Sequence, residues 1–261
     1  MKRVLGRKQS SRQEDWQAVM ANIRDHVTRK ELDEATKAAC EGIRQHTKGK
    51  KAAYTWSGGK DSLVIGDMCR KLGINDCVFV HTDLEYPAFL DWCTTNLPQG
   101  CQVINTGQGL DWLSKHPGML FPANAALASR WFGIVQRAGI GQYYRQHGLD
   151  ILVEGHRKAD GNFVGKDGLH TNASGLTRYS PLADWPHELL LAYIHYHKLA
   201  MPPIYDWKDG YRCGTHPWPA RPGMKTQAQG WQEVFDIDPA VVQEAALVLD
   251  SAAAFLEGVG A

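Results

Sequence analysis

Short apolar runs alternate along this chain with longer segments in which apolar residues recur every three or four positions. Continuous apolar runs suit the strands of a parallel sheet, because such strands are buried on both faces. Runs of apolar or β-prone residues cover 52–56, 77–80 and 151–153, and a further strand is expected at 102–105. Because helical segments separate these runs, the order predicts an α/β fold. We expect a doubly wound, mostly parallel sheet with helices on both faces.

The helical segments are recognised by their period and, in two places, by signals at their ends. Gly73 stands where a C-terminal cap belongs, directly after an apolar stripe. Asp184 is placed to cap a later helix that has Pro186 in its first turn. Residues 159–176 are rich in Gly, Asp and Asn, which favours a mobile loop or a hairpin over the site. The expected helices cover residues 16–44, 61–72, 87–96, 124–147, 184–199 and 239–256.

These patterns divide the chain into three parts. Residues 1–50 are expected to form an N-terminal helical extension, residues 51–200 the α/β core, and residues 201–261 an aromatic and basic loop followed by a terminal helix. The first 13 residues contain Lys and Arg but no acidic residue. This composition is typical of a frayed, solvated terminus, and the alternative is an arm that contacts nucleic acid.

Composition narrows the class of protein. The net charge is +1, so no overall field draws the chain to nucleic acid or to a membrane surface. No apolar run approaches the roughly 20 residues that a membrane span needs, and the N-terminus lacks the apolar centre of a signal peptide. We therefore expect a cytoplasmic protein with no membrane partner.

The chain contains 6 cysteines, and none are spaced as Cys-x-x-Cys. A disulfide framework is not expected in a protein of this size that is not exported, and an iron–sulfur cluster lacks its paired ligands. Cys213 and His216 have the spacing of half a metal site, but the sequence offers no matching second pair.

One segment predicts a phosphate site. Residues 57–62 read Ser-Gly-Gly-Lys-Asp-Ser and join an expected strand to an expected helix. Two glycines let a ligand approach the backbone, and a helix N-terminus presents free N–H groups to an anion. A Walker loop is excluded because Tyr54 occupies the position of its first Gly and Asp61 follows the Lys. The dinucleotide pattern Gly-x-Gly-x-x-Gly is also missing.

This loop resembles the pyrophosphate loop of the adenine nucleotide α-hydrolase superfamily. Three further segments extend the likeness: His-Thr-Asp at 81–83, Gly-His-Arg at 155–157, and residues 180–203 with Tyr205. Together they resemble the phosphoadenosine phosphosulfate (PAPS) reductase family over roughly residues 50–215. The resemblance makes the expected core a pyrophosphate-loop nucleotide-binding unit.

The resemblance also implies roles for particular residues. Thr82 and Asp83 would lie near the adenosine, and Arg157 with Lys158 would meet the sulfate or phosphate end, beside Gly155. Lys60, Asp61 and Arg157 would be the catalytic residues, and Asp61 would assist Mg²⁺ through the phosphates when ATP is the substrate. The phosphates would be held by Ser57, Gly58, Gly59, Lys60, Asp61 and Ser62.

The chain departs from the family where the reductase chemistry belongs. Sulfonucleotide reductases of this kind attack sulfur with a thiolate in a C-terminal Glu-Cys-Gly-Leu-His motif, whereas this chain has no cysteine after Cys213. Many relatives also read Arg-Trp-Cys where this chain has Arg130-Trp131-Phe132. A reductase without its nucleophile must use another thiol or catalyse another reaction.

Three functions therefore remain open. The first is attack of an acceptor at the α-phosphate of ATP with release of pyrophosphate, the acceptor being a small molecule, tRNA or DNA. The second is thioredoxin-dependent reduction of PAPS or of adenosine phosphosulfate (APS) with Cys213 as the nucleophile. The third is a nucleotide-binding module without turnover, and a homo-oligomer is compatible with each.

Overall fold

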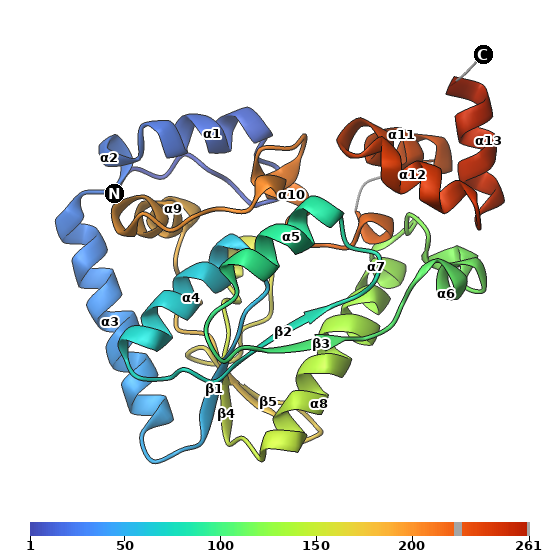
Figure 1. Ribbon diagram of the computed structural model, residues 1–261. Helices are drawn as coiled ribbons and strands as arrows, with labels where there is room; N and C mark the ends of the chain where they lie inside the picture. Colours follow the sequence, from blue (N-terminus) through green and yellow to red (C-terminus); the bar gives the residue numbers. More distant parts are fainter. Residues whose placement is uncertain (222–225, 260–261) are drawn as a thin grey trace.

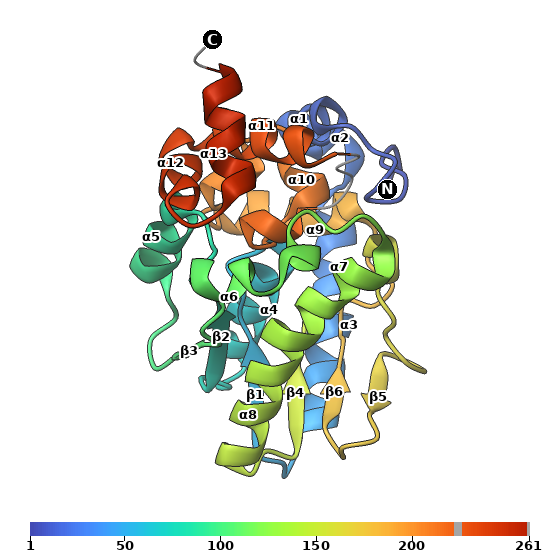
Figure 2. The ribbon, with the colours of Figure 1, turned by 90° about the vertical axis from the view of Figure 1, so that its right-hand side faces the viewer.

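A computed structural model describes residues 1–221 and 226–259 and contains a six-stranded sheet. The strand order is β3-β2-β1-β4-β6-β5, and all neighbours are parallel except β5 and β6 (Figures 1 and 2). The strands are β1 (Ala52–Thr55), β2 (Cys77–His81), β3 (Gln102–Asn105), β4 (Ile151–Val153), β5 (Leu169–Thr171) and β6 (Thr177–Tyr179). The predicted mostly parallel α/β sheet is thus confirmed, and β5 and β6 form a hairpin that begins within the predicted loop at 159–176.

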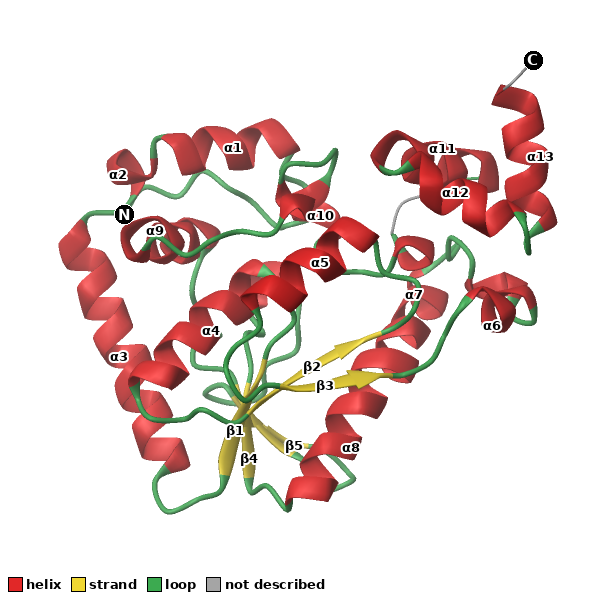
Figure 3. Cartoon of the chain, viewed as in Figure 1, coloured by secondary structure: helices red, strands yellow, loops and turns green. Residues whose placement is uncertain are grey.

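Helices cover both faces of the sheet. The pair α7 and α8 lies on one side, and α3 and α4 lie on the other (Figures 1 and 3). The α-helices of the core are α3 (Arg29–Thr47), α4 (Lys60–Lys71), α5 (Pro87–Asn96), α6 (Leu110–Ser114), α7 (Ala125–Phe132), α8 (Ala138–His147) and α9 (His187–His197). Short 3₁₀ turns occur at Pro117–Met119, Lys158–Asp160, Pro203–Tyr205 and Trp218–Ala220, and the π-helical segment η2 is Gly133–Arg137.

The remaining helices lie near the two ends of the chain. Helices α1 (Gln13–Ala21) and α2 (Ile23–His26) pack against α9, and α10 (Gly210–Cys213) packs against α1. Helices α11 (Gln227–Ile237), α12 (Pro239–Ala246) and α13 (Asp250–Val259) pack against one another. No helix of the described ranges is both long and apolar enough to cross a membrane.

Two long helices expected from the sequence are interrupted. The predicted helix at 16–44 is three helices, because the chain turns at Asn22 and restarts at Thr28. There the Thr28 hydroxyl accepts the Glu31 N–H at 3.3 Å while the Glu31 carboxylate accepts the Thr28 N–H at 2.9 Å, a capping box. The predicted tail helix at 239–256 is interrupted between α12 and α13.

The predicted cap at Asp184 is wrong. Pro186 occupies the N-cap position of α9, and the Asp184 carboxylate instead pairs with the Lys158 ammonium at 2.6 Å. Helix α11 was not expected, and its interior contains Gly230, a poor helix former. Gly73, in contrast, has the positive φ of +82° that suits its predicted position after α4.

Helix α8 packs closely on strand β2, which forms part of the site described below. A Cβ added at Gly139 would lie 2.5 Å from Cγ1 of Val80, so only glycine fits at this crossing. Gly141, one half-turn further along α8, would place its Cβ 3.3 Å from the Arg145 guanidinium, the far end of a flexible side chain. The two positions share a helix but differ in the space around them.

We predict that Gly139→Ala lowers the free energy of unfolding by about 1–3 kcal/mol, because the new methyl group overpacks the helix–strand contact. The matched control Gly141→Ala should be neutral or gain about 0.5–1 kcal/mol from its better helix propensity. Urea unfolding followed by circular dichroism measures both. Equal stability of the two variants would contradict the packing described here.

Candidate nucleotide site

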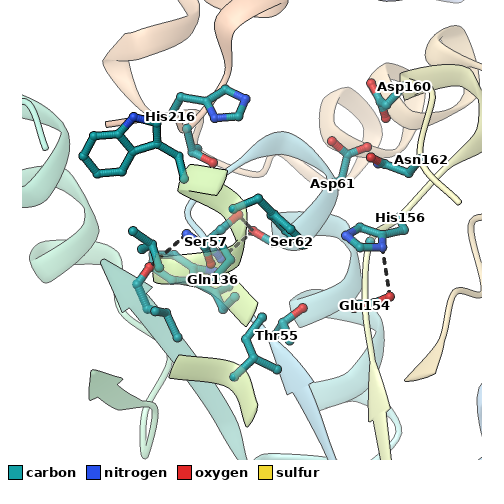
Figure 4. A pocket seen from close by; sticks show the side chains of 18 of the residues that line it. Thr55, Ser57, Asp61, Ser62, Gln136, Glu154, His156, Asp160, Asn162 and His216 are labelled. Atoms are coloured by element: carbon teal, nitrogen blue, oxygen red, sulfur yellow. Dashed lines mark hydrogen bonds and ion pairs between the residues drawn. The ribbon is translucent and has the colours of Figure 1, made fainter. Parts of the chain in front are cut away.

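A cavity of about 580 Å³ opens at the carboxyl ends of β1, β2 and β4. One wall is apolar and consists of Val78, Val80, Trp131, Phe132, Val135 and Ile140. The opposite parts of the lining are polar and include Ser57, Asp61, Ser62, Glu154, His156, Asp160, Asn162 and His216 (Figure 4). An apolar slot beside polar groups suits a ligand with an aromatic ring at one end and charged groups at the other.

The loop at 57–62 is here called the phosphate loop. Its backbone conformation is fixed by close packing around its glycines. Gly58 has a φ of +68°, and a Cβ there would lie 2.7 Å from the Cys93 sulfur. The Ser57 N–H donates to the Ser62 hydroxyl at 3.0 Å, which closes the turn. Helix α4 follows immediately, so the amides of its first turn have no acceptor one turn earlier in the helix. One of them, the N–H of Lys60, donates to the Tyr205 hydroxyl at 2.8 Å.

Four charged side chains form a buried cluster beneath this loop. The Arg157 guanidinium lies 2.6 Å from the Asp61 carboxylate and 2.7 Å from the Asp160 carboxylate. The Lys60 ammonium lies 2.6 Å from Asp61 and 3.3 Å from Asp160. Burial alone would raise the pKa of Asp61, but the charges of Arg157 and Lys60 outweigh it and hold that pKa well below its usual value. The cluster as a whole is neutral.

His187 completes the surroundings of Arg157. The guanidinium, which is fully buried, donates to the Trp185 carbonyl at 3.0 Å and meets Nδ1 of His187 at 3.2 Å. Because arginine can only donate, Nδ1 of His187 must accept, and the imidazole is neutral. Burial, and then the charge of Arg157, lower the pKa of His187 to about 3. Arg157 is therefore engaged beneath the cavity and is not among the residues that line it.

The structure brings some of the predicted site residues together and separates others. Ser57, Asp61, Ser62 and Gly155 line the cavity, whereas Lys60 and Arg157 lie in the cluster beneath it. A Cβ at Gly155 would lie 2.9 Å from Cβ of Asp61, so the end of β4 packs directly on the start of α4.

The other predicted residues have partners outside the cavity lining. The Thr82 hydroxyl is buried and donates to the Gln108 carbonyl at 2.7 Å, and Asp83 accepts a hydrogen bond from Asn105. Lys158 is paired with Asp184 at the surface. Cys213 is buried, and burial raises the pKa of its thiol. Within the described ranges, no cluster of three or more His, Cys, Asp or Glu residues is arranged to hold a metal ion, around His216 or elsewhere.

A pair that the sequence reasoning did not single out faces the same cavity. Nδ1 of His156 lies 2.9 Å from the Glu154 carboxylate (Figure 4). Burial alone would lower the pKa of His156, but the hydrogen bond and charge of Glu154 raise it above its ordinary value. Alternation along an extended segment places residues two apart on one side, so the spacing of this pair after β4 was the available signal.

Residues from outside the 51–200 segment also line the cavity. Lys8 and Gln9 come from the N-terminal arm, defined here as residues 1–12, and Arg212 and His216 come from the segment after α9. His216 lies at the solvent-exposed edge of this lining. The expectation that this arm is frayed is wrong for its backbone, since the N–H groups of Val4 and Leu5 donate to the Glu188 carboxylate at 2.6 and 2.7 Å.

We predict that Arg157→Met lowers the free energy of unfolding by about 3–5 kcal/mol, because Asp61 and Asp160 lose one of the two cations that they share. The matched control is Lys158→Met, which removes a neighbouring cation from a pair whose side chains are 60% and 79% exposed. We expect the control to cost less than about 1 kcal/mol. Thermal and urea unfolding test this, and a stability loss shared equally by both variants would contradict the cluster.

Comparisons with known proteins show the family and the fold of the chain. A model of the family described as the phosphoadenosine phosphosulfate reductase domain matches residues 51–215. A solved structure of phosphoadenylyl-sulfate (PAPS) reductase from Candida auris, in complex with phosphate, has 19% identity and a TM-score of 0.50, and the match covers 69% of this chain and 92% of that one. NMN synthetase from Francisella tularensis has 13% identity and a TM-score of 0.45, with 86% and 92% covered.

No curated protein matches the chain. The likeness to the Candida auris enzyme shows a common fold. The family match spans more than half of the chain and includes the phosphate loop and the strand ends around the cavity. The chain belongs to the phosphoadenosine phosphosulfate reductase domain family, whose members include nucleotide-dependent enzymes.

Proposed function

We propose that this protein uses ATP: an acceptor attacks the α-phosphorus, and pyrophosphate leaves. The observation that carries the proposal is the location of the thiols. All six cysteines are described, and none of them is among the residues that line the cavity. Cys213, the candidate nucleophile for sulfonucleotide reduction, is buried, and its raised pKa disfavours a thiolate.

The lining suits an adenine nucleotide. The adenine ring would lie in the apolar slot between Val78, Val80 and Ile140. The phosphates would meet the hydroxyl groups of Ser57 and Ser62 and the amides at the start of α4. In this placement the adenine would contact the apolar wall of the cavity, and the phosphates would contact its polar lining.

Mg²⁺ is the metal that such a reaction implies. It is commonly bound by one or two carboxylates together with substrate phosphates, so a complete protein ligand set is not required. Asp61 and Asp160 line the cavity beside the phosphate loop and would be the carboxylates next to such an ion, although each of their four oxygens contacts Lys60 or Arg157 in this structure. When bound, Mg²⁺ would neutralise charge on the departing pyrophosphate.

The Glu154–His156 pair would accept the proton that the acceptor loses. The acceptor forms a bond to the α-phosphorus while the bond from that phosphorus to the bridging oxygen of the β-phosphate breaks. The acceptor proton passes to Nε2 of His156, since Nδ1 is engaged by Glu154. Glu154 then stabilises the imidazolium that forms.

The test supplies Mg²⁺, ATP labelled at the γ-phosphate, and one of three acceptor fractions: total tRNA, DNA, or a deproteinised small-molecule extract. We expect labelled pyrophosphate with one fraction, at a rate that Cys213→Ser leaves largely unchanged. Sulfite release from PAPS and thioredoxin that disappears in Cys213→Ser would establish the reductase instead. Nucleotide binding without turnover in every fraction would favour the non-catalytic module.

We predict that His156→Gln slows pyrophosphate release by about 100- to 10,000-fold with little change in ATP affinity. The control His170→Gln removes an imidazole from β5, outside the cavity lining, and should retain the native rate.

Glu154→Gln should change the pH profile in a defined direction. The native rate rises with pH as His156 loses its proton, and the raised pKa places this rise above pH 6.5. Removing the carboxylate charge lowers that pKa, so the rise should shift to lower pH with a smaller maximum rate. A profile unchanged in position would show that His156 is not the titrating base.

A further inference from the structure

We propose that Lys8 binds the β- and γ-phosphates of the nucleotide, so that the N-terminal arm completes a site whose other parts lie mainly in the family-matched segment. The inference rests on the proposed use of ATP. The arm precedes residue 51, where the family match begins, and the family likeness therefore assigns it no role.

The arm is attached to the protein at both ends. The fully buried carboxylate of Glu188 in α9 accepts hydrogen bonds from the backbone N–H groups of Val4 and Leu5. Directly after the arm, the Gln13 amide donates to the Tyr205 carbonyl at 2.6 Å and accepts the Tyr211 N–H at 3.2 Å. Lys8 lies between these two attachments, so its backbone is held over the cavity.

The side chain of Lys8 is directed into the site. It lines the cavity that also contains Ser57 and Ser62 of the phosphate loop. Its ammonium nitrogen lies 3.2 Å from the position that a Cβ of Gly214 would occupy, which places it against the segment after α10. Within residues 1–221 and 226–259, the Lys8 ammonium has neither an ion pair nor a hydrogen bond.

The surroundings of Lys8 favour an anionic ligand. Burial, and then the neighbouring charge of Lys60, lower the pKa of Lys8, so the cation sits in an unfavourable environment without a ligand. The nearby carboxylates Asp61 and Asp160 are already paired with Lys60 and Arg157. A phosphate group would supply the missing negative charge.

The charge requirement of ATP points to the same residue. Loop amides and hydroxyl groups can bind one phosphate, but a triphosphate also needs cations near its distal groups. Among the described residues that line the cavity, Lys8 and Arg212 are the only Lys or Arg. One guanidinium nitrogen of Arg212 pairs with Asp209 at 2.7 Å, whereas its Nε has no hydrogen-bond partner. Lys8 is therefore the one of these two cations that has no ion pair among the described residues, and it is the one assigned to the distal phosphates.

The test is calorimetric titration of the full chain with ATP, ADP and AMP. Lys8→Met keeps the length of the side chain and removes its charge. We expect ATP affinity to fall about 10- to 100-fold, the usual range for a lost charge-assisted bond, while AMP affinity changes less than about twofold. The matched control is Arg7→Met, an exposed neighbour on the same arm that does not line the cavity.

The outcomes separate this inference from the proposed function. Unchanged ATP affinity in Lys8→Met, or an equal loss in Arg7→Met, overturns the role of Lys8 even if pyrophosphate release occurs. If the native protein binds PAPS but not ATP, the proposed function fails. The role of Lys8 is then tested by the losses of PAPS and AMP affinity in Lys8→Met. A larger loss for PAPS supports that role, and equal losses overturn it. If the native protein binds no adenine nucleotide, both fail.

Discussion

The ion pair between Arg157 and Asp61 joins the two halves of the site. Arg157 follows the end of β4, and Asp61 lies in the first turn of α4, so their contact fixes the phosphate loop against the neighbouring strand. Lys60 and Asp160 balance the remaining charges, which offsets the cost of burying Lys60 and Arg157. The shape of the cavity depends on this arrangement, because Asp61 is shared between the cluster and the lining.

Local patterns in the sequence predicted the sheet and the loop. The strands at 77–80 and 151–153 are apolar runs that need no information from elsewhere in the chain, and the Ser-Gly-Gly-Lys-Asp-Ser loop has a defined backbone requirement. Strands β5 and β6 have three residues each, which is too short for a period to show. The break at Thr28 was signalled by its capping box with Glu31, a stronger guide there than the apolar stripe that crosses it.

The site was harder to predict because its parts meet only through tertiary contacts. Arg157 was expected at a phosphate, and its position next to Asp61 depends on the packing of β4 on α4. Lys8 is 49 positions before Ser57 in the sequence, and no periodicity links the two. The same limitation applies to Cys213, whose burial follows from packing rather than from the residues beside it. Family likeness therefore identifies the loop and the strand ends, whereas the surroundings of each side chain follow from the packing.

The π-helical segment η2 has a consequence for how the cavity wall can vary. A π turn contains one residue more than an α turn, so it absorbs an additional residue within about one turn of the helix. Residues from all three parts of this continuous helix, Trp131 in α7, Val135 in η2 and Ile140 in α8, face the same cavity. Removing one residue from η2 would convert the π turn into an α turn and leave the rotation of α7 relative to α8 nearly unchanged. A one-residue difference in length could thus be accommodated at η2 while Trp131 and Ile140 keep their places on the cavity wall.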